Sequence, residues 1–378
     1  MIENYIGTLI YYMIYMISVM LSYIWSKKGK LNWYFILSFT LILGLRGCGI
    51  DYNPMDEIFH QIVNLKFGLF DEKYYTFNLN EYSDFSAFEY AYMVLIKVIR
   101  LVKGGSVLFF STIALLQAFF FELASREYDR TIRMLIAFSF FGTLAFCVCF
   151  NTVRQMIVVF MFMTLSKFIV QRKFFEYTTG CIVLYLFHRS AIVLWPLYFV
   201  INRDLFYNKK ITIIIYLICM IGAEVFKNLI MDLSDMLFGI IGQSSFINTN
   251  YMKSDNLEML GSSVASSIVF LSSFLLINLY GDKIKTNHNR LLPLFNMTII
   301  GYFMNLFIFN IGFQRLTYYF FYMSIIILGI ALRMSLSDTN LHKKILGVIT
   351  ILLLCLWFVN AVLNGAAGCS PYEFSRYL

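Results

Sequence analysis

The sequence predicts an all-α, polytopic integral membrane protein with about twelve transmembrane helices and one amphipathic helix outside the membrane. Of its 378 residues, 60% are hydrophobic. Only 14% are charged, against about 25% in an average soluble protein, and the mean hydropathy is +0.71. Apolar runs follow one another from end to end, and basic residues gather in alternate connections between them. A large soluble catalytic domain is therefore excluded.

The first apolar run is expected to remain as a span. It carries Glu3 and lacks the basic start and the A-x-A site of a cleaved signal peptide. Eleven further runs are apolar over most of the length that a membrane span requires. Because the chain has only four prolines, no repeat and no low-complexity tract, we expect a single domain over 1–378. The twelve expected spans are residues 5–25, 31–45, 105–123, 132–150, 152–170, 174–187, 190–201, 211–230, 263–280, 291–310, 312–332 and 345–363.

Basic residues lie in every second connection, as the positive-inside rule requires of cytoplasmic loops. Six connections hold three each, which accounts for 18 of the 30 Lys and Arg residues, and all six are cytoplasmic if both termini face outward. The formal net charge of +8 therefore reports orientation, and no nucleic-acid partner is expected. The connections contain Lys27, Lys28, Lys30; Arg126, Arg130, Arg133; Lys167, Arg172, Lys173; Arg203, Lys209, Lys210; Lys283, Lys285, Arg290; Arg333, Lys343 and Lys344.

The segment 85–103 resembles a thirteenth span, but counting it would place the later basic connections outside. Lys97, Arg100 and Lys103 recur every three residues, as on an amphipathic helix lying on the outer surface. The alternative is a true span offset by a misread one elsewhere. The external loops are then residues 46–104 and 231–262. The first is acidic and rich in Tyr, which suits a hydroxyl-rich ligand, although an ordinary solvated loop explains it equally well.

Ionisable residues at the outer ends of spans are costly and indicate functional sites. Arg46 ends one span, and the glycines after it allow a turn that returns Asp51 toward it; a plain membrane-edge arginine is the alternative. Asn151, Arg154 and Gln155 have the i, i+3, i+4 spacing of one helical face. An arginine in a first helical turn suits a diphosphate, and a snorkelling arginine is the alternative.

Two further outer ends carry polar residues. His188 lies between two short apolar stretches, which predicts a helix hairpin with a recessed tip. This histidine is a base, a diphosphate ligand or a packing residue. Arg315, Tyr318 and Tyr319 share a helical face, and an aromatic interface belt explains the tyrosines but not the arginine.

Soluble-enzyme motifs are missing from the sequence. It has no G-x-S-x-G, P-loop, G-x-G-x-x-G or H-E-x-x-H pattern, which leaves hydrolase, NTPase, dinucleotide and zinc-protease readings without support. The seven cysteines are scattered without a C-x-x-C pair, so they are expected to fill space. We expect neither a metal nor a cofactor.

Several of these patterns together resemble the EpsG family of multi-pass exopolysaccharide proteins, which is related to Wzy O-antigen and capsule polymerases. The most specific elements are N-x-x-R-Q at residues 151–155 and H-x-S-A at residues 188–191. The resemblance covers most of the chain, and it also rests on Arg46, Asp51, Tyr52, Glu89, Arg315, Tyr318 and Tyr319. Arg189, at the x of H-x-S-A, is not part of it.

The resemblance implies a GT-C-like glycosyltransferase that joins oligosaccharide repeat units on undecaprenyl diphosphate at the outer face of the bacterial cytoplasmic membrane. Membrane lipid, a chain-length regulator of the Wzz type and a flippase of the Wzx type are the implied partners. We expect Arg154 and Arg315 to hold the diphosphate, with Arg46 and Gln155 in support. Asp51 is the first candidate for the general base, and His188 is the second. Glycan contacts are assigned to Tyr52, Glu89, Asn151, Ser190, Tyr318 and Tyr319.

Two other activities fit part of the sequence. A lipid-linked oligosaccharide flippase or transporter would also have about twelve spans, but paired broken helices in two halves are missing. A membrane O-acyltransferase would use His188 as its base, and the expected topology puts this residue far from a cytoplasmic acyl donor. A purely structural scaffold would not need the recessed arginines.

Overall fold

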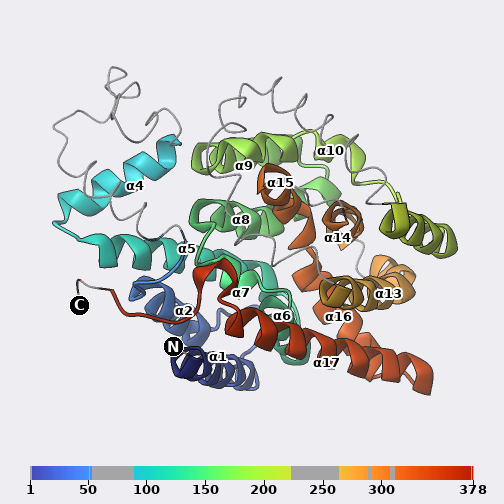
Figure 1. The fold of residues 1–378 in the computed structure, drawn as a ribbon. Helices are drawn as coiled ribbons and strands as arrows, with labels where there is room; N and C mark the ends of the chain where they lie inside the picture. The colour runs from blue at the N-terminus through green and yellow to red at the C-terminus, as the bar shows by residue number, and fades with distance from the viewer. Residues whose placement is uncertain are drawn as a thin grey trace.

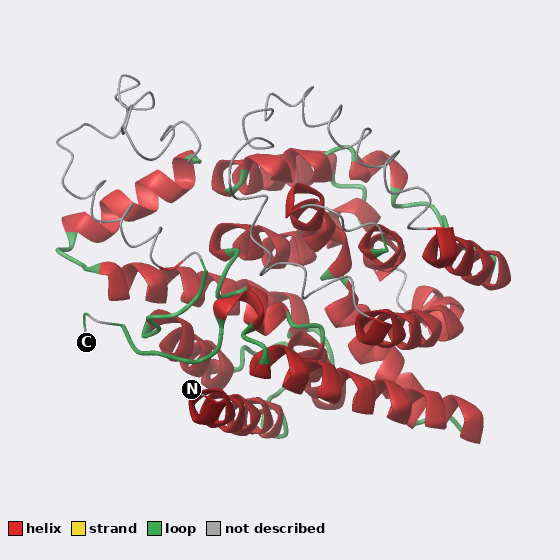
Figure 2. Cartoon of the chain, viewed as in Figure 1, coloured by secondary structure: helices red, strands yellow, loops and turns green. Residues whose placement is uncertain are grey.

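The computed structural model describes residues 2–50, 52, 89–222, 264–287, 291–306, 311–375 and 377. Regular structure in these ranges is helical throughout (Figure 1; Figure 2). The β contact found among them is an isolated bridge between Arg46 and Phe374. The predicted all-α class is confirmed.

Within each described range, the helices follow one another through short connections. In chain order they are α1 (Ile2–Ser22), α2 (Trp33–Gly44), α4 (Tyr90–Leu101), α5 (Ser106–Ser125), α6 (Arg130–Gly142), α7 (Ala145–Val148), α8 (Val153–Val170), α9 (Phe174–Phe187), the 3-10 helix η3 (Arg189–Leu194), α10 (Leu197–Val200), a helix over residues 209–222, α13 (Val264–Asn287), α14 (Leu292–Asn305), α15 (Ile311–Phe321), α16 (Ser324–Leu336), α17 (Leu341–Leu363) and the 3-10 turn η7 (Ala366–Gly368).

Six helical stretches among the described residues are long and apolar enough to cross a membrane. Because a helix satisfies its own backbone hydrogen bonds, such stretches are stable in lipid. They identify the chain as a membrane protein, as the composition predicted. The six are Glu3–Ser22, Ser106–Ser125, Val153–Val170, Ser266–Thr286, Arg315–Leu336 and Leu341–Leu363.

The expected span 132–150 is interrupted. Helix α6 ends at Gly142, and Leu144 takes a left-handed φ of 61° before the short helix α7. No proline causes the break. Both the N–H and the hydroxyl of Thr143 donate to the carbonyl of Ser139, at 2.9 and 2.8 Å, and this local pairing closes the helix end.

Two other expected spans also differ from one continuous α-helix. Residues 190–201 form η3 and α10 instead, and 3-10 turns of this kind are normally short. Residues 312–332 belong to α15 and α16, which are separated by two turn residues but run on as one apolar stretch. Hydropathy averages over such breaks and cannot show them.

Helix α4 occupies part of the segment expected to be amphipathic. One face is buried against the bundle, where it contacts α5 and α9, through Tyr92, Met93, Ile96 and Ile99. The helix starts directly after Glu89, which is itself buried. Packing of α4 therefore fixes the position of this carboxylate.

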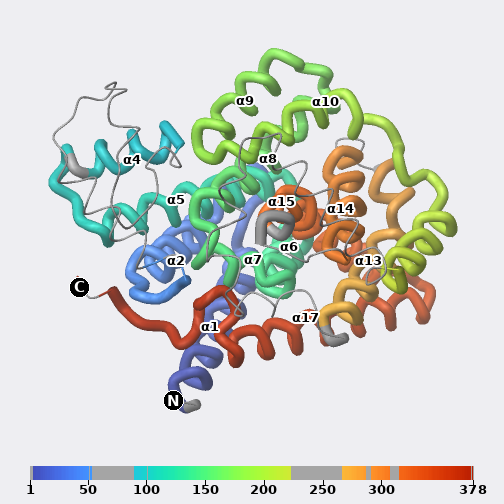
Figure 3. The backbone as a smooth tube through the Cα atoms, turned by 45° about the horizontal axis from the view of Figure 1, so that its top comes forward, coloured from blue at the N-terminus to red at the C-terminus, as the bar shows by residue number. Residues whose placement is uncertain are grey.

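The interior of the bundle is formed by close helix pairs. Helix α2 packs on α5, α6 on α16, α5 on α8, and α14 on α15. Gly329 of α16 lies against the backbone of Ile136 in α6, a small-residue contact that lets membrane helices approach closely. Figure 3 shows α6, α8 and α15 inside the bundle, with α1 and α4 at its edge.

Candidate functional site

Four segments that are distant in sequence meet at one end of the bundle. Glu89 lies at the start of α4, and Arg154 and Gln155 lie in the first turn of α8. His188 connects α9 to η3, and Tyr319 lies on α15. We call these residues, with Ser190 and Arg315, the Glu89 cluster.

The carboxylate of Glu89 is the centre of this cluster. Its Oε2 accepts a hydrogen bond from Nη1 of Arg154. Its Oε1 lies 2.7 Å from Nδ1 of His188 and accepts the backbone N–H of Arg189 at 3.2 Å. The Glu89 side chain is only 4% exposed, whereas those of Arg154 and His188 are each 17% exposed. A buried carboxylate requires such pairing and hydrogen bonds.

The surroundings set the protonation of both partners. Burial favours a neutral Glu89, but Arg154 and His188 outweigh it and lower the pKa of Glu89 to about 2. Burial lowers the pKa of His188 below its ordinary value, and Glu89 works against this change. An ionised carboxylate only accepts hydrogen bonds, so Nδ1 of His188 carries the proton. A neutral ring then has its lone pair on Nε2, the form that can act as a base.

Helix α15 closes the other side of the cluster. The amide of Gln155 donates to the backbone carbonyl of Arg315. The hydroxyls of Ser190 and Tyr319 lie 2.8 Å apart, and the Tyr319 ring centre is 6.5 Å from that of His188. These contacts hold α8, η3 and α15 together at the cluster.

The two arginines of the cluster differ in their environment. Arg154 pairs with Glu89, and its guanidinium lies over the ring of Tyr92 at 5.3 Å. Arg315 is half-buried, and within the described part of the chain no carboxylate lies at ion-pair distance from it. Its charge contributes to the lowered pKa of His188. As far as the described residues show, the cluster therefore has one guanidinium paired with a carboxylate, that of Arg154, and one that is not, that of Arg315.

The hairpin expected around His188 is present. Helix α9 ends at Phe187, and His188 is extended, with φ −159° and ψ 115°, before η3 turns the chain back. The hydroxyl of Tyr177 on α9 donates to the carbonyl of Leu194 at the end of η3, which ties the two arms together. The arms are short, so the tip carries His188 and Ser190 toward α15.

Arg46 packs against the segment before α8 and against the C-terminal segment. It is 1% exposed, and its Nη1 donates to the carbonyl of Cys149 at 3.2 Å. Its guanidinium lies over the rings of Phe110 and Phe150, at 5.4 and 5.1 Å. Its backbone pairs with Phe374. Arg46 is thus enclosed between aromatic rings and the C-terminal segment, and its diphosphate role stays a prediction.

Tyr52 packs on the same ring as Arg46, that of Phe110. Its ring stacks on Phe110 at 4.9 Å, and its hydroxyl is 3.0 Å from that of Ser375. Asp51, the first candidate for the base, lies outside the described residues. The expected return of Asp51 toward Arg46 is therefore untested.

The helical face expected to unite Asn151 with Arg154 and Gln155 is shorter than predicted. Helix α8 begins at Val153, and Asn151 belongs to the turn before it. The backbone N–H of Asn151 donates a hydrogen bond to the carbonyl of Val148 at 3.0 Å. Asn151 is 5% exposed. The prediction of one shared helical face is wrong for this residue, because the helix starts later than the spacing implied.

On α15, Tyr318 and Tyr319 have different surroundings. Tyr319 points its hydroxyl to Ser190, whereas the ring of Tyr318 packs 5.2 Å from that of Tyr322.

The sequence prediction placed Glu89 among the glycan contacts and missed its central position. A lone glutamate before a helix has no spacing signal, so only the position of α4 relative to α8 and α9 reveals it.

The described residues contain no group of three or more His, Cys, Asp or Glu side chains arranged to hold a metal ion. Comparison with known families matches residues 31–374 to the EpsG family, a range that includes every member of the Glu89 cluster. No curated protein and no solved structure matches the chain. Since the match covers nearly all of the sequence, the chain belongs to the EpsG family.

Proposed function

We propose that this protein is a polysaccharide polymerase, a GT-C-like glycosyltransferase of about twelve spans with both termini outside. It transfers a glycan from undecaprenyl diphosphate to a second lipid-linked unit at the outer face of the bacterial cytoplasmic membrane. Family membership and the apolar helices support the proposal. The observation that carries it is the pairing of Arg154 and His188 with the buried carboxylate of Glu89, together with Arg315, whose charge acts on His188.

The leaving group needs fixed positive charge. When the bond from the anomeric carbon to the diphosphate oxygen breaks, negative charge grows on that oxygen. Arg315, whose guanidinium lacks a carboxylate partner in the described chain, is the first ligand that we assign to the diphosphate. Arg154 is the second, and guanidinium groups suit phosphate because they donate two parallel hydrogen bonds.

The acceptor hydroxyl needs a base. We assign this role to Nε2 of His188, which takes the hydroxyl proton while the new bond from oxygen to the anomeric carbon forms. Glu89 accepts a hydrogen bond from the Nδ1–H group of His188 and stabilises the imidazolium that results, as the carboxylate of a catalytic triad does. Glu89 itself, with a pKa of about 2, is a poor proton acceptor at neutral pH.

Hydroxyl groups of the cluster are assigned to the sugar. Ser190 and Tyr319 form a hydroxyl pair beside His188, where they can exchange hydrogen bonds with a glycan. Gln155 orients the α15 backbone at Arg315. In this proposal the glycan lies between η3 and α15, and the diphosphate lies toward the membrane.

The deciding experiment is reconstitution of the full chain in liposomes with one defined lipid-linked repeat unit. A polymerase extends the unit into longer lipid-linked glycans, resolved as a ladder on a gel. Transport of the unit across the bilayer without extension would overturn the proposal in favour of a flippase. For an O-acyltransferase, a cysteine in the Ser190→Cys variant would be labelled from the cytoplasmic side, whereas we expect labelling from outside.

A further inference from the structure

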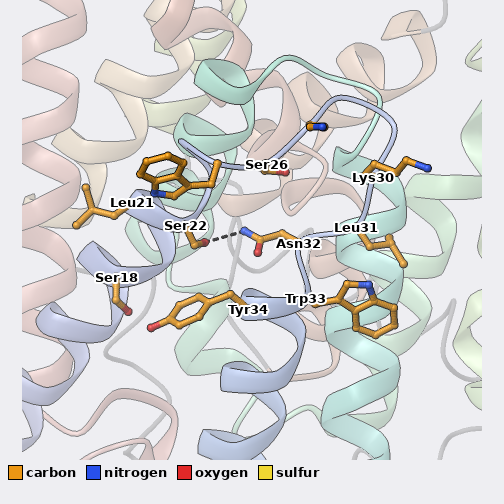
Figure 4. A pocket seen from close by; sticks show the side chains of 11 residues that line it. Ser18, Leu21, Ser22, Ser26, Lys30, Leu31, Asn32, Trp33 and Tyr34 are labelled. Carbon is orange, nitrogen blue, oxygen red and sulfur yellow. Dashed lines mark hydrogen bonds between the residues drawn. The ribbon is translucent and has the colours of Figure 1, made fainter.

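A groove opens between α1 and α2, at the opposite end of α2 from Arg46. Its volume is about 680 Å³, and eleven residues between Ser18 and Tyr34 line it. The amide of Asn32 donates to the hydroxyl of Ser22 at 2.7 Å and joins the end of α1 to the start of α2 (Figure 4). The groove lies beside the connection of Lys27, Lys28 and Lys30, which the charge pattern predicts to be cytoplasmic.

The loop that forms one wall of this groove is held by a buried ion pair. Glu122 of α5 and Arg133 of α6 are both fully buried and 2.6 Å apart. Arg133 donates to the hydroxyl of Ser26 at 2.5 Å and to the carbonyl of Lys27 at 3.2 Å. Glu122 accepts the backbone N–H of Asn32 at 2.7 Å.

A further contact fixes the middle of the loop. Gly29, with a φ of +81° that suits glycine, donates its N–H to the carbonyl of Arg126 at 2.7 Å. A buried ion pair adds little stability by itself because removing the charges from water is costly. Here it positions a loop, so the lysines on that loop start from a fixed backbone.

The loop is strongly basic. Lys27, Lys28 and Lys30 are all exposed, and among the described residues no carboxylate lies at ion-pair distance from them. Of the acidic groups of the neighbouring helices, Glu122 is engaged by Arg133, and Asp129 accepts the first backbone N–H groups of α6. Lys27 and Lys30 line the groove itself, which gives it a positive rim.

Aromatic and apolar side chains continue from this rim. Trp25 and Trp33 are 86% and 58% exposed, as in the aromatic belt at a membrane interface. Leu21 lies in the groove, and Ile14 and Ile17 of α1 and Leu37 of α2 are also exposed beyond it. The surface therefore changes from basic to aromatic to apolar in the order of a phospholipid's headgroup, interface and acyl chains.

We propose that this groove binds an anionic phospholipid of the cytoplasmic leaflet. Its phosphate lies against Lys27 and Lys30, and its acyl chains follow the exposed apolar faces of α1 and α2. The charge complementarity of the rim identifies the headgroup as anionic. No residue of this site belongs to the Glu89 cluster. Failure of the proposed polymerase activity would therefore not count against the lipid site, and failure of the lipid site would not count against the polymerase.

The test uses tryptophan fluorescence of the full chain in phosphatidylcholine bilayers that contain a small fraction of brominated lipid. Brominated phosphatidylglycerol is expected to quench more strongly than brominated phosphatidylcholine. The double variant Lys27→Gln, Lys30→Gln keeps side-chain length without charge and should lower this preference about fivefold per lysine. Lys344→Gln, an exposed lysine in another basic connection, is the control and should retain it.

Four results would overturn the proposal. The first is equal quenching by the two brominated lipids in the unaltered protein. The second is an unchanged preference in the double glutamine variant, provided that it elutes from size exclusion as the unaltered protein does. The third is loss of the preference on adding inorganic phosphate, which would mean that the lysines recognise a free anion and not a lipid. Loss of preference in Lys344→Gln would assign the effect to overall charge and also overturn it.

Discussion

Glu89 and His188 are separated by 99 positions in the chain, yet Oε1 of the carboxylate lies 2.7 Å from Nδ1 of the ring. Burial of His188 lowers its pKa, whereas the arginine beside Glu89 keeps the carboxylate ionised. The pair therefore combines a neutral imidazole with a charged carboxylate at neutral pH. This combination is the one in which an imidazole accepts a proton and a carboxylate stabilises the product.

Replacing Glu89 with Gln should slow polymerisation about 100-fold or more, because general base catalysis contributes on this scale. A neutral His188 is the active form, so activity is present above its pKa and is lost as the pH falls through that value. Glu89 raises the pKa of His188, so the variant should lose activity only at a lower pH than the unaltered protein. The profile of kcat/KM against pH measures this shift. If the variant loses activity at the same pH as the unaltered protein, or at a higher pH, the assigned role is contradicted.

The two arginines of the cluster give a second prediction. Arg315→Ala and Arg154→Ala should each reduce polymer formation about 100- to 1,000-fold, the usual cost of losing one group that stabilises developing charge. Arg189→Ala is the matched control, because its side chain is exposed and only its backbone contacts Glu89. Polymer ladders are measured at equal amounts of membrane-embedded protein. Normal length and yield from both cluster variants would remove the diphosphate assignment.

The Ser190 and Tyr319 hydroxyls form one contact, and their variants should reflect this. Tyr319→Phe and Ser190→Ala should each lower the free energy of unfolding by about 1 kcal/mol, the usual value of a hydrogen bond. Because both remove the same bond, the double variant should cost less than the sum of the two. Unfolding in detergent, followed for all three variants, provides the comparison. Strictly additive losses would show that the bond does not couple η3 to α15.

The sequence predicted the class of the fold but not its helix breaks. Composition and apolar runs suffice for a helical membrane protein, because each is an average over many residues. The break after Gly142 depends on one hydroxyl and one left-handed residue, Leu144, and it leaves hydropathy unchanged. Local backbone pairing of this kind is invisible to a window of about 20 residues.

Candidate residues were predictable where position alone marks them. Arg154, His188 and Arg315 lie at those ends of apolar runs that the charge pattern predicts to face outward, and this signal selected them. Glu89 carries no such mark, because its position depends on the packing of α4 on α9. The enclosure of Arg46 was also unpredictable, since it requires Phe374 from the far end of the chain.

Gly301 of α14 supplies the last prediction, which concerns how α15 is held. A Cβ at this position would meet the backbone N of Phe321 and its Cα, the latter at 2.5 Å. Backbone atoms cannot yield as a side chain can, so Gly301→Ala should lower the free energy of unfolding by about 1–3 kcal/mol. Because α15 carries Arg315 and Tyr319, polymerisation should fall as well.

Gly7→Ala is the control, since a Cβ there meets no atom within 4 Å, and it should raise stability by about 0.5–1 kcal/mol. Thermal unfolding of both variants in detergent, with polymer yield alongside, measures the difference. A Gly301→Ala protein as stable and active as the unaltered chain would show that α14 does not position α15.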